Sequence, residues 1–256
     1  MSITDPLAEF RSAVLERWLP TYCHDPKRQY EIAGFRESSM RVTSVDAKDC
    51  LRAISGDLVS DGGGGRYRAR KSTAFESLFW EGSKTKVPRR ITLWLEPVIS
   101  FASLARLHFD HGWPIELLGT QPKSWAFDIA AHCPVQTSNY RILGEVKKSV
   151  REAEALIDDL ARMSTGEEAI AVRANSRKKW IGLLASKPLI VWIVGPGGFS
   201  KVFAMTYPSP DSARLVEAAA EALSFSRAVR PSISIQPTAC MRAHTFCMLP
   251  RRRIQR

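Results

Sequence analysis

The chain has 256 residues, 45% of them apolar and 25% charged, a composition typical of a folded globular protein rather than a disordered one. No apolar run approaches the ~20 residues that cross a bilayer, and residues 1–20 lack the charged and apolar segments of a signal peptide. We therefore expect a soluble, cytoplasmic protein with no membrane partner. The cysteines are odd in number, so we expect reduced thiols.

The net charge of +11 is concentrated in three basic stretches, at residues 66–90, 170–187 and 241–256. Such stretches attract polyanions by releasing counterions, and they carry no sequence information of their own. A single stretch is equally well explained as a solvated surface. The three together favour a nucleic acid, and we expect DNA. The candidate nucleic-acid-binding residues are Arg66, Arg68, Arg70, Lys71, Arg177, Lys178 and Lys179.

Residues 1–90 are expected to form a mostly helical accessory region before the main domain. Apolar side chains at helical spacing predict a helix over residues 5–19, which Pro20 should end. Residues 62–65 are four consecutive glycines, too flexible for the interior of a helix or strand, and they predict a mobile loop. They do not match a phosphate-binding loop, because the following G-K-[ST] is missing.

From residue 91 to 230 the pattern predicts a single α/β core. A helix should begin at Glu96-Pro97 and run to about residue 110, since proline suits a first-turn position. This helix is apolar most of the way round, so we expect it to be buried. Three strands are expected next, over residues 113–118, 125–131 and 140–146.

The second half of the core continues with helices and strands. Ser149 should cap an amphipathic helix, and another helix is expected over residues 167–185. The continuous apolar run LIVWIV predicts a buried central strand. A strand over residues 201–207 and a last helix beginning at Ser209-Pro210 complete the core, and residues 231–256 form a basic tail. This order predicts a mixed sheet flanked by helices.

Polar residues interrupt two of the predicted strands. Asp128 lies in one apolar run, and Glu145-Val146-Lys147 closes the next. Because strand side chains alternate between faces, Glu145 and Lys147 should point the same way. If the two strands are neighbours, Asp128 joins them in one patch. Two carboxylates and an amine are the minimal equipment for metal-assisted hydrolysis of a phosphodiester.

This order of elements, with Asp128 and the Glu145-Val146-Lys147 motif, resembles the PD-(D/E)XK nuclease superfamily, the restriction endonuclease-like fold. The resemblance covers about residues 96–207, and Phe127 stands where the family's name-giving proline would be. It implies a further acid before the strands. Glu96 is our candidate, and Glu76 is the alternative if residues 72–81 form the relevant helix.

The chemistry of the residues agrees with this resemblance. Asp128 and Glu145 would supply oxygen ligands to Mg²⁺ or Mn²⁺, with the Val146 carbonyl as a third ligand. Lys147 would orient the attacking water and stabilise the developing charge. We therefore expect a metal-dependent DNA endonuclease, with Glu96, Asp128, Glu145 and Lys147 as its catalytic site. The alternative is a catalytically inactive DNA-binding or assembly protein on the same scaffold.

Two questions stay open at this point. Cys240, His244 and Cys247 have a spacing that could supply three zinc ligands, but no fourth ligand lies nearby and the usual paired C-x2-C spacing is missing, so a structural zinc is the less favoured interpretation. A homodimer would let one kind of site cut both strands of a duplex. The sequence leaves open whether the chain dimerises and which form of DNA it takes.

Overall fold

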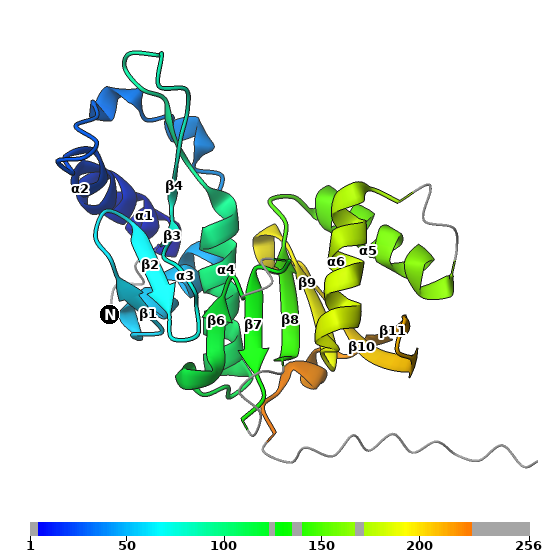
Figure 1. The fold of residues 1–256 in the computed structure, drawn as a ribbon. Helices are drawn as coiled ribbons and strands as arrows, with labels where there is room; N and C mark the ends of the chain where they lie inside the picture. The colour runs from blue at the N-terminus through cyan, green and yellow to red at the C-terminus, as the bar shows by residue number, and fades with distance from the viewer. Residues whose placement is uncertain (1–4, 123–125, 135–139, 167–171, 227–256) are drawn as a thin grey trace, which may run out of the picture. The chain divides into compact units, whose positions relative to one another are not determined.

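The computed structural model describes residues 5–122, 126–134, 140–166 and 172–226 (Figure 1). The described chain up to Phe225 forms one compact unit. The group Cys240, His244 and Cys247 and the basic tail lie outside the described residues. No helix in the described part of the chain is long and apolar enough to cross a membrane.

A six-stranded mixed sheet forms the centre of this unit, in the order β11-β10-β9-β8-β7-β6. β8 and β9 are parallel, and all other neighbouring strands are antiparallel. The expected α/β class with a mixed sheet is therefore confirmed. The strands are β6 (Leu118–Thr120), β7 (Ile129–His132), β8 (Tyr140–Val146), β9 (Ile190–Val194), β10 (Ser200–Ser209) and β11 (Ser212–Ala218).

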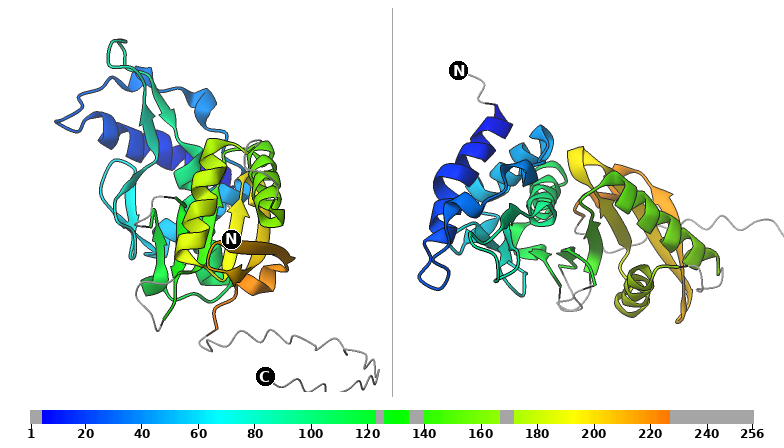
Figure 2. Two further views of the ribbon diagram at one scale, coloured as in Figure 1. Left: turned by 45° about the vertical axis from the view of Figure 1, so that its right-hand side comes forward. Right: turned by 90° about the horizontal axis from the view of Figure 1, so that it is seen from above.

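Helices cover both faces of this sheet (Figure 2). α4 (Leu95–Ala105) contacts β6, β7 and β8 on one face, while α5 (Val150–Thr165) and α6 (Ala174–Ser186) pack on the other. Alternate residues of β8 enter the two apolar cores, with Ile142 on the side of α4 and Leu143 on the side of α5 and α6. A parallel pair needs a long crossover, and α5 with α6 supplies it between β8 and β9.

The region before α4 is helical only in part. It contains α1 (Pro6–Ser12), a π-helical turn (Ala13–Trp18), α2 (Leu19–Cys23) and α3 (Ser44–Ser55). It also contains a three-stranded sheet and a two-stranded ribbon. Their strands are β1 (Val59–Asp61), β2 (Arg66–Ala69), β3 (Glu76–Ser77), β4 (Phe79–Glu81) and β5 (Ile91–Leu93).

Short 3-10 and π-helical turns connect the elements in both halves of the chain. They cover Ile32–Gly34, Glu37–Ser39, Arg106–Asp110, Ile115–Leu117, Pro196–Gly198 and Ala220–Leu223.

Residues on both sides of position 90 share one hydrophobic core. Phe10, Cys50 and Tyr67 belong to the same buried cluster as Phe101 and Trp192. α3 packs along α4 and thereby joins the accessory region to the sheet. The division into residues 1–90, 91–230 and 231–256 stays a prediction, but no gap in the packing separates the first two parts.

Several local expectations are confirmed. The helix beginning near Glu96 is α4, extended by the π-helical turn to Asp110, and residues 97–105 are buried. Ser149 caps α5 by accepting a hydrogen bond from the Glu152 N–H. The four glycines connect β1 to β2, and three of them have positive φ. β8 and β9 lie where their apolar runs predict them.

Pro20 does not end the first helix, contrary to expectation. The π-helical turn before it shifts the hydrogen bonds by one residue, so that the Leu19 N–H donates to Val14. Pro20 then occupies the first turn of α2, where a missing N–H leaves no bond unmade. A pattern of apolar residues carries no information about such a shift.

Three other boundaries were misjudged. The strand expected over residues 113–118 begins only at Leu118, after a 3-10 turn, and the strand expected from residue 125 begins at Ile129. α6 begins at Ala174, and the earlier residues 167–171 lie outside the described chain. The last helix, predicted to begin at Ser209-Pro210, is not formed. Ser209 and Pro210 turn the chain into the hairpin β10–β11, whose residues Ala213 and Leu215 alternate into the core beside α5.

Candidate active site

β7 and β8 are neighbours, so the structure brings Asp128 to the Glu145-Val146-Lys147 segment. Asp128 directly precedes β7, and its N–H donates to the Gly144 carbonyl at 2.9 Å. Its carboxylate Oδ2 accepts a hydrogen bond of 2.8 Å from the Val146 N–H. This bond fixes the Asp128 side chain beside the residue that follows Glu145.

Glu145 lies in the middle of the sheet and is 2% exposed. Its Oε1 accepts from the Lys147 ammonium at 2.5 Å, and its Oε2 accepts from the Lys179 ammonium at 2.6 Å. Two charge-assisted hydrogen bonds, one to each oxygen, hold the Glu145 carboxylate in one orientation. The shared face of Glu145 and Lys147 that strand alternation predicts is therefore present.

Lys179 belongs to this group, although its basic sequence neighbourhood predicted a place on the DNA-binding surface. It is 8% exposed on α6, and it also donates to the Ala126 carbonyl at 2.8 Å. Its neighbours Arg177 and Lys178 are exposed. Helical spacing contained a signal for this difference, because Lys179 shares the buried side of α6 with Ser176, Trp180 and Leu183.

Electrostatics at the site follow from its burial. Burial, and after it the neighbouring Glu145 carboxylate, raises the pKa of Asp128 to about 8, although the Val146 N–H and the Lys179 ammonium act against this. Burial by itself would lower the pKa of Lys147, but the Glu145 carboxylate outweighs it, and Asp128 and Glu96 add to the rise. Lys147 is therefore a cation at neutral pH.

Glu76 and Glu96 both lie within electrostatic reach of this group. Glu76 lies on β3. Its role as the alternative acid depended on a helix over residues 72–81, and this helix is not formed. Glu76 is nevertheless buried, and burial raises its pKa to about 7, with a further rise from Glu96 and an opposing hydrogen bond from Thr120. Glu96, in the first turn of α4, accepts a hydrogen bond from the Trp94 indole at 2.8 Å.

The two acids act on different partners. Glu76 contributes to the raised pKa of Asp128, and Glu96 contributes to that of Lys147. The structure therefore adds Glu76 to the predicted group instead of replacing Glu96. One carboxylate oxygen of Glu76, Oε1, is buried without a hydrogen-bond partner. A buried unpaired acceptor beside other carboxylates is a place where a cation is stabilising.

The described side chains at the site offer a metal ion only a few ligands. Within the described ranges no three His, Cys, Asp or Glu side chains form a ready-made set of ligands. Mg²⁺ does not require such a set, since it keeps several waters and uses one or two carboxylates. Asp128 and Glu145 fit this requirement, because a carboxylate has about four lone-pair positions and the lysines occupy only part of those on Glu145.

A cavity of about 200 Å³ opens beside the two lysines, where α5 and α6 meet the end of β8. Lys147, Lys179, Asn175 and Ser176 line it. Phe127 is buried against Gly182 on α6. Its ring therefore fills space under the helix that carries Lys179.

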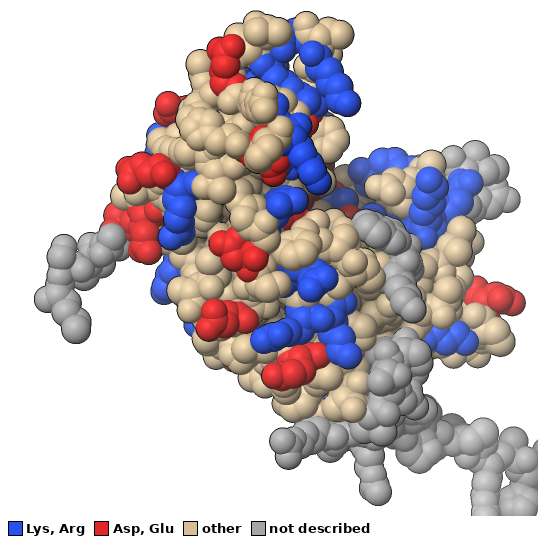
Figure 3. Space-filling model, turned by 60° about the vertical axis from the view of Figure 1, so that its left-hand side comes forward, with Lys and Arg blue, Asp and Glu red and all other residues tan. Residues whose placement is uncertain are grey.

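The predicted DNA-binding residues outside α6 lie on and just after β2. Arg68, Arg70 and Lys71 are exposed, while Arg66 donates to the carbonyls of the glycine loop. The Lys71 N–H donates to the Leu118 carbonyl, so this segment borders β6. On the face drawn in Figure 3, lysine and arginine side chains gather in several groups with acidic side chains between some of them.

No family model, no curated protein and no solved structure matches the chain. The resemblance to PD-(D/E)XK nucleases therefore stays a prediction from the sequence.

Proposed function

We propose that the protein is a metal-dependent DNA endonuclease of the PD-(D/E)XK type that hydrolyses phosphodiester bonds. The observation that carries the proposal is the hydrogen bond from the Val146 N–H to Asp128, which holds the acid of one strand beside the Glu-x-Lys motif of the next. The order α4, β6, β7, β8, α5–α6, β9 supports it, because it matches the order that the family resemblance implies.

Asp128 and Glu145 would hold Mg²⁺ or Mn²⁺, with the Val146 carbonyl as a third ligand. The ion, when bound, would polarise the phosphate and acidify a bound water. Lys147 is protonated, so it acts by donating hydrogen bonds to the phosphate and to the attacking water and not as a base. Lys179 is a positioning residue, since it orients Glu145 through its second oxygen.

Cleavage of supercoiled plasmid DNA with Mg²⁺ or Mn²⁺ tests the proposal. We expect Asp128→Asn, Glu145→Gln and Lys147→Ala each to lower the cleavage rate by about 100-fold or more, since each removes a charged group that acts on the reacting phosphate. Lys201→Ala serves as a matched control, because this exposed lysine of β10 pairs with Glu217 of β11. Circular dichroism confirms that each variant is folded.

Two outcomes would contradict the proposal. One is cleavage by the three variants at the rate of the wild type. The other is a wild-type protein that binds DNA without cleaving it under any metal condition, which would establish the non-catalytic DNA-binding or assembly protein instead. The products also report on assembly, because nicked circles indicate one cut at a time, whereas direct linearisation indicates two sites acting together.

A further inference from the structure

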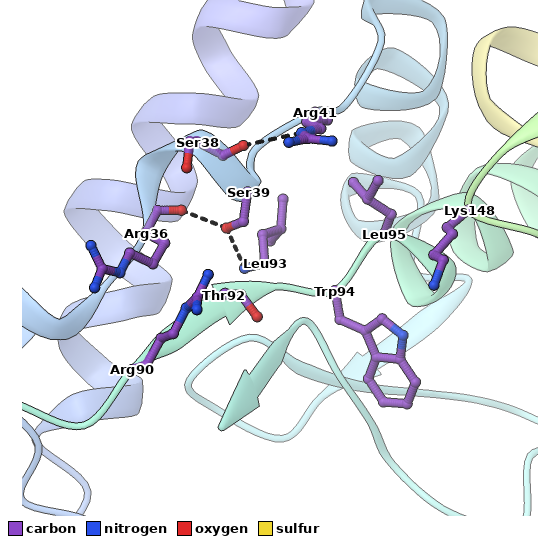
Figure 4. A pocket seen from close by; sticks show the side chains of 10 residues that line it. All are labelled: Arg36, Ser38, Ser39, Arg41, Arg90, Thr92, Leu93, Trp94, Leu95 and Lys148. Atoms are coloured by element: carbon purple, nitrogen blue, oxygen red, sulfur yellow. Dashed lines mark hydrogen bonds between the residues drawn. The ribbon is translucent and has the colours of Figure 1, made fainter. Parts of the chain in front are cut away.

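A second cavity, of about 260 Å³, lies beside the candidate site and is strongly basic (Figure 4). Four cationic side chains contribute to its wall, and none of the described residues in the wall is acidic. In the view of Figure 4, Arg36 and Arg90 lie to the left, and Trp94 and Lys148 lie to the right. The fourth cation is Arg41.

One wall of this cavity is the exposed face of the β4–β5 ribbon. Ile91 and Leu93 are buried, so the alternate residues Arg90, Thr92 and Trp94 share the opposite face. Trp80 pairs directly with Thr92 across the ribbon and is 59% exposed.

The indole rings of Trp80 and Trp94 are in edge contact, with centroids 5.5 Å apart. Tryptophan is highly buried on average, so an exposed tryptophan beside a second indole is unusual. The Trp94 ring is also held in place, because its Nε1 donates to Glu96. The ribbon therefore presents a pair of aromatic side chains that core packing does not require.

The charge of the cavity is not cancelled locally. Glu81, the acid of the same ribbon, lies on the alternate position and is bound by Arg28 and Arg89. No described carboxylate forms an ion pair with Arg36, Arg41 or Arg90. Lys148 has only a loose, exposed pair with Glu152 at 3.6 Å, which is weak in water. An anion would therefore find unpaired donors here.

Two residues of this cavity adjoin residues of the candidate site. Lys148 follows the catalytic lysine, Lys147, and Trp94 is hydrogen-bonded to Glu96, the acid of α4. A ligand bound here is thus a neighbour of the phosphodiester that Lys147 would contact. At about 260 Å³ the cavity is below the ~300–1,000 Å³ of sites that enclose a whole drug-sized ligand, so it suits one nucleotide and not several.

We propose that the cavity residues Trp94, Arg36, Arg41, Arg90 and Lys148, together with Trp80 at the edge of the cavity beside Trp94, bind an unpaired nucleotide of single-stranded DNA next to the bond to be cut; this surface is here called the strand pocket. Indoles stack on bases of any sequence, and arginines bind the phosphates between them. In an intact duplex the faces of the bases are covered by their neighbours, so they are not open to an indole. The inference rests on the proposed function and narrows its substrate to DNA with an unpaired segment.

Binding measured without catalysis tests the strand pocket. Fluorescence anisotropy in EDTA compares an oligo-dT of about 12 nucleotides, which lies within the range of common single-strand site sizes, with a blunt duplex. We expect Trp80→Ala to weaken binding of the single strand by about five- to 150-fold, the equivalent of one lost stacked base. Trp80→Phe should keep most of the single-strand affinity of the wild type. Binding of the duplex should be weakened less by Trp80→Ala than binding of the single strand.

Charge is tested separately from stacking. Arg90→Gln should weaken single-strand binding and lower the slope of log affinity against log salt by about one. Phe109→Ala is the matched aromatic control, since this ring is also partly exposed but lies beyond the other end of α4. Unchanged single-strand binding in Trp80→Ala, an equal loss for duplex and single strand, or a preference for RNA over DNA would overturn the inference.

The two proposals fail in different ways. If Asp128→Asn abolishes cleavage but Trp80→Ala binds single strands normally, only the strand pocket is wrong. If Asp128→Asn and Lys147→Ala cleave like the wild type while Trp80→Ala loses the single strand, the pocket stands and the catalytic site is wrong.

Discussion

At the scale of single residues, the structure separates two neighbouring lysines that the sequence treats alike. Lys178 is exposed on α6, whereas the Lys179 ammonium is buried against Glu145 and the Ala126 carbonyl. An exposed lysine can neutralise a phosphate, whereas a buried lysine donates its hydrogen bonds to groups inside the protein. The two positions therefore have different roles.

We expect Lys178→Met to weaken DNA binding and to reduce its salt dependence, because it removes one exposed charge. Lys179→Met should leave binding in EDTA unchanged but lower the cleavage rate by more than it changes the apparent affinity, since Glu145 loses the partner that orients it. Salt titrations and rates at saturating DNA measure the two effects. Loss of binding in Lys179→Met with a normal rate would return this lysine to the DNA-binding surface.

At the scale of elements, buried charges connect the N-terminal region to the sheet. Arg106, at the end of α4, pairs with Asp46 and Asp49 of α3, both at 2.8 Å. Asp46 also accepts from the Gly197 N–H in the turn between β9 and β10. This network orients α3 against α4, the helix that begins with Glu96, and so supports the site from a distance.

We expect Arg106→Met to lower the free energy of unfolding by about 3 kcal/mol or more, because it leaves a buried carboxylate without its cation. Arg52→Met is the matched control: its ion pairs are more exposed, so the loss should be below about 1 kcal/mol. Urea unfolding measures both. An equal loss of unfolding free energy in the two variants would contradict the idea that burial makes the Arg106 ion pairs more stabilising.

At the scale of the whole molecule, the continuous core links the chemistry of the site to global stability. The pKa of Asp128 is raised to about 8 and that of Glu76 to about 7, whereas unfolded acids titrate near ~4. Between these values the folded protein binds more protons than the unfolded chain. The contribution of these two acids to stability must therefore fall as the pH rises through this range.

We expect the free energy of unfolding, measured in EDTA, to decrease from about pH 5 to about pH 9. Asp128→Asn should make this decrease shallower without abolishing it, because Glu76 still titrates in the same direction. Urea unfolding at several pH values provides the measurement. A wild type whose stability is flat or rises over this range would refute the assignment of buried, protonated acids.

Local patterns predicted much of the fold. The apolar runs of β8 and β9, the cap at Ser149 and the start of α4 near Glu96 all lie where expected, since each depends on residues close in sequence. The hairpin β10–β11 was missed for the opposite reason. Its second strand is set by pairing with the first, which outweighs a serine and a proline that would also suit a helix.

The sequence by itself determined that Glu145 and Lys147 point to the same face of one strand, because strand alternation is a local property. That the strand after Asp128 lies beside it was decided by the tertiary structure. Only the tertiary structure decided that Glu76 and Lys179 belong to the same group and that Trp80, Arg36 and Arg90 lie beside it. These residues come from separate elements, and their proximity depends on how a β-ribbon, a sheet and α6 pack. Packing of distant segments follows from burial of the whole core and not from any short pattern.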